Sequence, residues 1–251
     1  MSIINDGIRL DDAAVRSFLM IGQSNMAGRG DIGDVPRINN SACFMLRNGR
    51  WQKMHEPINP DRPIFESKYK SGIGLAASFA DELNKATGLP IGLIPCADGG
   101  TSIDDWKKGG LLFDHAIMQT GLAMRTSKLS GIIWHQGEND CVSEELFAAY
   151  REKFIKFVSD VREALGSPEL PFIAGELSLE LGPITTFADR PARFNALLRG
   201  LEGEISNFAV VSSGGLAMKG DGLHFSATGQ RELGKRYFDA YKKLCLSEES
   251  R

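Results

Sequence analysis

The sequence predicts an α/β protein of three layers, in which a central parallel β-sheet is covered by helices on both faces. The first observation is an alternation, because apolar runs of strand length recur about five times and each is followed by a segment of helical periodicity. The second is that these runs are continuously apolar, as at 131–134, which is typical of parallel strands buried on both sides. The third is that polar, glycine-rich segments follow the runs, at the sheet edge where ligands bind in open α/β sheets.

The individual elements follow from these patterns in chain order. Strands are expected where short apolar runs occur, at 15–21, 90–95, 131–134, 172–174 and 208–211. Helices are expected where apolar residues recur on one face, at 74–87, 112–128, after a capping Ser143, at 190–204, and after a capping Ser226. An Asn-Gly turn predicts a hairpin over 43–51, as an appendage to the sheet. A polar lead-in and two surface loops are expected at 1–14, 55–73 and 176–189.

Bulk composition excludes several classes of function. The chain has 251 residues, of which 42% are hydrophobic and 24% charged, as in ordinary globular proteins. The formal net charge of −3 gives no electrostatic reason to expect nucleic acid or an anionic membrane as partner. No linker or repeat interrupts the pattern, so we expect one domain over residues 1–251.

The N-terminus does not resemble a signal peptide, since no basic segment precedes an apolar one. No apolar run approaches the ~20 residues that span a bilayer. We therefore expect a cytoplasmic protein that does not enter a membrane.

Cysteines and histidines are too scattered to indicate a metal or redox centre. Four cysteines occur without a Cys-x-x-Cys pair and are expected to be reduced packing residues: Cys43, Cys96, Cys141 and Cys245. The four histidines are too sparse for a metal cage, and the sequence has no His-Glu-x-x-His, Walker A or Gly-x-Gly-x-x-Gly motif. We expect no metal or organic cofactor.

Ser24 is a candidate nucleophile because of its place in the chain. The apolar run 18–21 ends abruptly in Gly-Gln-Ser-Asn, so a tight turn lifts the Ser24 hydroxyl from the end of a predicted strand. A serine in such a turn is also ordinary turn chemistry. Catalysis therefore requires a base, an orienting acid and an oxyanion site elsewhere.

Asp221 and His224 offer the base and the acid just before the last helix. An imidazole base needs a partner on its second nitrogen, and a carboxylate three residues away in a bent loop can supply it. The alternative is a surface histidine beside a turn-forming aspartate.

Oxyanion donors are offered by two further segments. The Gly99-Gly100 pair lets a backbone N–H approach a substrate closely, or simply forms a turn. Gln136 and Asn139 carry amides that can donate to the same oxygen, or satisfy loop backbone. Glu138 and Asp140 either organise that loop or are solvated carboxylates.

Together these segments resemble one known group of enzymes, the sialate O-acetylesterase/acetylxylan esterase group, which is carbohydrate esterase family 6 of the SGNH hydrolase superfamily. Four blocks carry the resemblance: Gly22-Gln23-Ser24-Asn25-Met26 with Gly28-Arg29-Gly30, Gly99-Gly100-Thr101-Ser102 with Trp106, Trp134-His135-Gln136-Gly137-Glu138, and Asp221-x-x-His224-Phe225. The blocks occur in the family's order and span nearly the whole chain.

The resemblance implies a flavodoxin-like α/β/α fold and assigns roles to the candidate residues. Ser24 is the nucleophile, His224 the base and Asp221 its orienting acid. The oxyanion hole combines backbone N–H groups of Ser24 and Gly100 with one side-chain amide. Family usage favours Gln136 for this amide, and the superfamily pattern Gly-x-Asn-Asp offers Asn139 instead. Gly99 and Glu138 are supporting residues.

The expected activity is removal of O-acetyl groups from a small or oligomeric carbohydrate through an acetyl-enzyme. One alternative is a lipase- or thioesterase-like hydrolase, which the mostly polar loops at 55–73 and 176–189 disfavour. The other is a catalytically silent carbohydrate-binding protein, in which aromatic side chains stack on sugar rings; the candidates are Trp51, Phe65 and Trp106.

Overall fold

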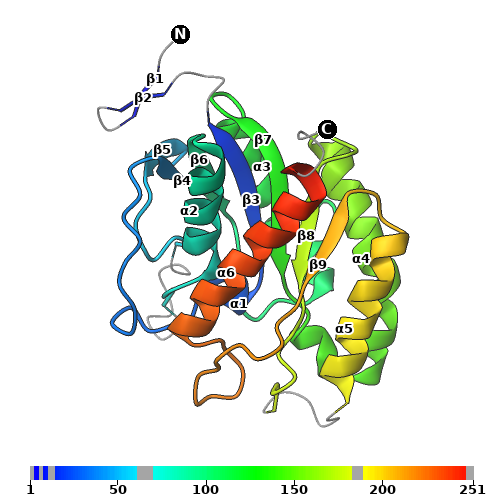
Figure 1. Cartoon of the computed structure of the whole chain (residues 1–251). Coiled ribbons are helices and arrows are strands. Elements are labelled where there is room, and N and C mark those ends of the chain that lie inside the picture. The colour runs from blue at the N-terminus through cyan, green and yellow to red at the C-terminus, as the bar shows by residue number, and fades with distance from the viewer. Residues whose placement is uncertain (1–2, 6–7, 11–14, 61–69, 183–188, 247–251) are drawn as a thin grey trace.

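A seven-stranded sheet runs through the centre of the computed structural model, in the order β5-β4-β6-β3-β7-β8-β9 (Figure 1). The structure describes all residues except 1–2, 6–7, 11–14, 61–69, 183–188 and 247–251. The strands are β3 (Arg16–Gly22), β4 (Cys43–Arg47), β5 (Arg50–Lys53), β6 (Ile91–Pro95), β7 (Lys128–His135), β8 (Phe172–Gly175) and β9 (Phe208–Val211). Neighbours from β4 to β9 pair in parallel, and β5 pairs antiparallel at one edge. The predicted α/β class is confirmed, with a mixed, mostly parallel sheet.

Helices cover both faces of this sheet and complete the three layers. They are α1 (Ser24–Ala27), α2 (Leu75–Thr87), α3 (Leu111–Ala123), α4 (Glu144–Ala164), α5 (Arg190–Gly200) and α6 (Ala227–Tyr241). Short turns of 3-10 helix lie at Ile103–Trp106, Asn139–Cys141 and Leu201–Gly203, and a π-helical turn at Lys242–Leu246. α2 and α6 lie together on one face, and α3, α4 and α5 pack on the other (Figure 1).

The central strand β3 shows why its sequence is continuously apolar. Phe18 and Met20 belong to the core beneath α2 and α6, whereas Leu19 and Ile21 belong to the core beneath α3 and α4. Successive side chains of a strand point to opposite faces, so a strand covered on both sides needs apolar residues at every position.

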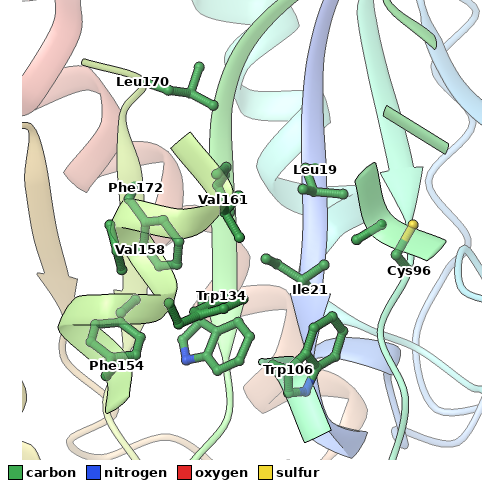
Figure 2. Close-up of a cluster of buried hydrophobic side chains, with 14 of the residues drawn as sticks. Leu19, Ile21, Cys96, Trp106, Trp134, Phe154, Val158, Val161, Leu170 and Phe172 are labelled. Carbon is green, nitrogen blue, oxygen red and sulfur yellow. The ribbon is translucent and has the colours of Figure 1, made fainter. Parts of the chain in front are cut away.

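Aromatic side chains fill the core beneath α4. Figure 2 shows Phe154 of α4 beside Phe172 of β8, with Trp134 of β7 close by. The Phe154 and Phe172 rings meet edge to face, with their centroids 5.7 Å apart. The ring centroids of Trp134 and Phe157 are 4.8 Å apart, and the two rings are tilted to each other. Such offset and edge-on contacts are the favourable arrangements of aromatic pairs.

Two tryptophans that the sequence offered for sugar stacking lie inside the protein, so that prediction is wrong for both. Trp106 is 0% and Trp51 3% exposed. Each indole N–H is satisfied internally, by Thr101 Oγ1 for Trp106 and by Thr126 Oγ1 for Trp51. The third candidate, Phe65, lies outside the described residues.

The two predicted N-caps are confirmed, but two helices end earlier than predicted. The Ser143 hydroxyl accepts the N–H of Leu146 and the Ser226 hydroxyl that of Gly229, as N-caps do. α5 ends at Gly200 and not at the predicted residue 204, because the chain tightens into the 3-10 turn Leu201–Gly203. α3 ends at Ala123, not at the predicted residue 128, because the Ser127 hydroxyl bonds the Ala123 carbonyl and the chain turns into β7.

Three other expectations need correction. The hairpin β4-β5 is part of the main sheet, because β4 pairs in parallel with β6. The lead-in contains two short antiparallel strands, β1 (Ile3–Asn5) and β2 (Ile8–Leu10). The flanks of the predicted loop at 55–73 are partly internal, since Glu56, Ile58 and Asn59 are buried. Its middle lies outside the described residues.

The aromatic core predicts a large loss of stability for Phe154→Ala. Truncating a fully buried Phe costs about 3–5 kcal/mol through lost contacts and the cavity that remains. Urea unfolding measures the difference. Leu111→Ala is the control, because Leu111 is 84% exposed and its truncation should change stability by less than about 0.5 kcal/mol. Equal stability of the two variants would contradict this packing.

Candidate active site

Polar segments after β3, β6 and β7 meet at one end of the sheet, the lower end in Figure 1, where α1 follows β3. The N–H of Gln23 bonds the carbonyl of His135 at 2.9 Å, and the N–H of Asp98 bonds the carbonyl of Gly22 at 2.9 Å. The loop before α6 reaches the same end. Four segments far apart in the sequence therefore form one site, as the parallel sheet predicts.

Gly22 makes the turn that carries Ser24. Its φ is +130°, and a Cβ atom there would lie 2.2 Å from the His135 carbonyl oxygen. Glycine is thus required for β3 to pass so close to β7. The chain then enters α1, whose first residue is Ser24. The N–H of a first helical residue has no acceptor within the helix.

Ser24, His224 and Asp221 form a continuous chain of hydrogen bonds. Ser24 Oγ lies 3.0 Å from His224 Nε2, and His224 Nδ1 lies 2.8 Å from Asp221 Oδ2. A carboxylate accepts from Nδ1–H, which leaves Nε2 to accept the hydroxyl proton. The other Asp221 oxygen accepts the backbone N–H groups of Leu223 and His224, both at 2.9 Å, and so closes the bent loop.

The surroundings favour the neutral form of His224 and the ionised form of Asp221. Burial lowers the pKa of His224, as do the nearby charges of Arg29 and Lys219, and Asp221 opposes them only in part. Burial opposes ionisation of Asp221, but its hydrogen bonds from His224 and Leu223 outweigh this and lower its pKa to about 2. A neutral imidazole beside a carboxylate can accept a proton from a hydroxyl.

The Gly99-Gly100 pair lies against Ser24. A Cβ atom on Gly99 would lie 3.4 Å from Ser24 Cβ and 2.6 Å from an Arg29 guanidinium nitrogen. Gly100 follows, and its carbonyl accepts from Asn139 Nδ2 at 2.6 Å. The structure thus brings Gly99 and Gly100 beside Ser24, and Asn139 beside Gly100.

Gln136 has a different position. Its side chain is fully buried, and its amide nitrogen donates to Asp140 Oδ2 at 2.5 Å and to the Thr101 carbonyl at 3.0 Å. These two bonds use both of its N–H groups. Asp140 in turn accepts from the N–H of Ile103 at 3.1 Å. Gln136 and Asp140 thereby stabilise, from its buried side, the loop that begins with Gly99-Gly100, which we call the glycine loop.

Glu138 is buried behind the site and contacts a residue to which the sequence assigned no role, Asn25. Asn25 Nδ2 donates to Glu138 Oε1 at 2.6 Å. Burial raises the pKa of Glu138 to about 7, although this bond partly opposes it. Sequence reasoning missed Asn25 because its other partners are the backbone groups of Leu223 and Phe225, 198 and 200 residues away.

Two other kinds of site are absent from the part of the chain that the structure describes. No three His, Cys, Asp or Glu side chains there gather as a metal site would require. No helix among these residues is long and apolar enough to cross a membrane. All four cysteines are reduced, as predicted, and burial raises the pKa of Cys96 to about 12.

Comparison with known proteins supports the same class of enzyme. A probable carbohydrate esterase of Arabidopsis thaliana is 29% identical over 243 residues, which cover 89% of each chain. A solved Arabidopsis thaliana structure matches with a TM-score of 0.78 at 27% identity, covering 93% of this chain and 98% of that one. A Xanthomonas citri carbohydrate acetylesterase shares the fold, with a TM-score of 0.60 at 20% identity over 93% of this chain and 57% of that one.

The fold is that of the SGNH hydrolases, and the protein is a carboxylic ester hydrolase. A family model described as carbohydrate esterase, sialic acid-specific acetylesterase, matches residues 14–243, and the chain belongs to that family. The resemblance seen in the four sequence blocks is thereby confirmed.

The lowered pKa of His224 predicts an acidic limb in the pH profile of kcat/KM. A base must be unprotonated, so activity should be level near neutral pH and fall only as the pH drops below the ordinary histidine value of about 6.5. Esterase assays across the pH range measure this. Glu138→Gln is the control, because burial raises the pKa of the Glu138 carboxyl to about 7, so that this group also titrates in the pH range of the assay. A limb centred above pH 7, or one that Glu138→Gln removes, would contradict the assignment.

Proposed function

We propose that the protein is a serine esterase that removes O-acetyl groups from an acetylated carbohydrate through an acetyl-enzyme. The observation that carries this is the hydrogen-bond chain Ser24–His224–Asp221 at the end of the sheet. Family membership supports a carbohydrate ester as substrate. The names of the Arabidopsis and Xanthomonas relatives agree with this class.

The first half of the reaction transfers the acetyl group to the protein. Ser24 Oγ attacks the acetyl carbonyl carbon while His224 Nε2 takes its proton, and Asp221 stabilises the imidazolium. The bond between that carbon and the sugar oxygen then breaks. His224 returns the proton to the leaving sugar oxygen, which departs as a hydroxyl.

The second half returns the enzyme to its starting state. A water molecule attacks the acetyl carbonyl and gives its proton to His224 Nε2. The ester bond to Ser24 Oγ breaks, Ser24 recovers the proton from His224, and acetate leaves. Each half passes through an oxyanion that needs hydrogen-bond donors.

We propose three donors to this oxyanion. Two are the backbone N–H groups of Ser24 and Gly100. For the third we propose Asn139 in place of Gln136, the residue that family usage favours. Asn139 lies beside Gly100 and keeps one N–H after bonding its carbonyl, whereas both N–H groups of Gln136 are already bonded.

Acetate release by wild type and Ser24→Ala tests the proposed activity. With a chromogenic acetate ester, loss of the nucleophile should lower kcat by at least ~10⁴-fold. The same assay across acetylated xylan, sialic acid and simple acetyl sugars identifies the carbohydrate. Preference for an octanoyl over an acetyl ester indicates the lipase-like alternative. Equal activity of Ser24→Ala excludes the proposal.

Asn139→Ala tests the third oxyanion donor. Loss of one such donor should lower kcat by about 10²–10³-fold with little change in KM or stability, because Asn139 is only half-buried. Gln136→Leu is the comparison variant. It leaves Asp140 and the Thr101 carbonyl buried without their donor, which should cost about 1–3 kcal/mol in urea unfolding. A kcat of Asn139→Ala within threefold of wild type would exclude Asn139.

A further inference from the structure

Asn25 bonds both peptide groups that flank His224. Its Oδ1 accepts the N–H of Phe225 at 3.1 Å, and its Nδ2 donates to the carbonyl of Leu223 at 3.2 Å. Asn25 is itself the residue after Ser24, on the rigid turn of α1. One buried amide therefore joins the backbone beside the nucleophile to the backbone on either side of the base.

We propose that Asn25 is a positioning residue that sets the His224 imidazole against Ser24 Oγ. This proposal rests on the function proposed above. It gives a role to Asn25, which the proposed reaction steps do not involve. Asn25 does not touch the reacting atoms, so it acts through the peptide groups of Leu223 and Phe225. The hydrogen bonds from Leu223 and His224 to Asp221 are internal to the loop, so they do not fix its distance from Ser24. Lys219 ties the start of the loop to the Arg29 carbonyl and to Asp31, whereas Asn25 ties the two peptide groups that flank His224 itself.

Only an amide satisfies these partners. The Phe225 N–H requires an acceptor, whereas the Leu223 carbonyl and Glu138 Oε1 require donors. Asparagine supplies one oxygen acceptor and two N–H donors, which matches all three. The bond to Glu138 fixes which end of the amide is the nitrogen, and burial of Asn25 at 1% exposure excludes competing water.

Two further hydrogen bonds hold Asn25 itself in place. The backbone carbonyl of Asn25 accepts from Gln230 Nε2 of α6 at 3.0 Å. Glu138 follows β7 at the end of the sheet, so its bond to Asn25 connects the Asn25 side chain to the end of β7. The position of His224 relative to Ser24 is thus set from the sheet and from α6 together.

Two substitutions test this role. Asn25→Ala removes all three side-chain bonds, and Asn25→Asp keeps the size and the acceptor for Phe225 but loses the amide donors. Misplacement of a catalytic group by about 1 Å can cost about 10²-fold, so kcat should fall by about that factor with KM nearly unchanged. An NMR titration should also show the pKa of His224 moving up toward its ordinary value, because the ring is less firmly buried.

Asn195 provides a matched control. It is 2% exposed, and its amide bonds the N–H and the carbonyl of Leu177, both at 2.8 Å. Asn195→Ala and Asn195→Asp should therefore lose stability as the Asn25 variants do. They should leave kcat per folded molecule and the pKa of His224 unchanged.

The proposal is overturned if a folded Asn25 variant keeps kcat within threefold of wild type, or if the Asn195 variants lose kcat equally. Should neither Asn25 variant fold, the role is structural and the proposal is wrong. Failure of the proposed function is recognised separately, since wild type would then release no acetate from any ester. The rate at which an organophosphonate labels Ser24 would still report whether Asn25 positions His224.

Discussion

The close pairing of β3 with β7 is the constraint on which the rest of the structure depends. In this pairing Gly22 lies opposite His135. The Gln23 N–H then bonds the His135 carbonyl, so the pairing extends to the residue just before Ser24. The backbone that leads into Ser24 is therefore held by the sheet itself. Because the segment after β7 starts from the same pairing, the residues that brace the glycine loop are held in the same frame. A site built from strand ends inherits the rigidity of the two cores on either side of the sheet.

Buried polar side chains near the ends of β3 and β7 hydrogen-bond to the loops of the site and fix their positions relative to the sheet. Gln136 and Asp140 hold the loop of Gly99-Gly100 from within. Asn25 does the same for the loop that bears His224. The Gln136 and Asn25 amide nitrogens and the Asp140 carboxylate all make buried hydrogen bonds, and loss of such a bond leaves its partner unsatisfied at a cost in stability. The loop of Gly99-Gly100 and the loop that bears His224 thus take their shape from a small set of amides and carboxyls that are not proposed to react.

The chain Ser24–His224–Asp221 was predicted only with the family resemblance of the four sequence blocks, because each of these residues taken locally fits an ordinary turn. Local pattern by itself was enough to predict the fold, since strand burial on both faces leaves a mark in the sequence. It failed where a residue's partner lies far along the chain. Trp51 and Trp106 have the chemistry of sugar-stacking residues, and only tertiary packing shows that both are core. Gln136 and Asn139 carry the same amide, and which one has a spare N–H depends on Asp140 and Thr101. Asn25 resembled an ordinary turn residue, since its partners are peptide groups that any sequence would supply.

The central claim is that Ser24, His224 and Asp221 act as one acyl-transfer unit at the end of the sheet. Labelling with a stoichiometric organophosphonate, followed by peptide mass spectrometry, tests it most directly because the label reports which hydroxyl is activated. The account predicts a single label on Ser24 in wild type and a much slower reaction in His224→Ala. A label on another residue, or equal labelling rates with and without His224, would contradict it.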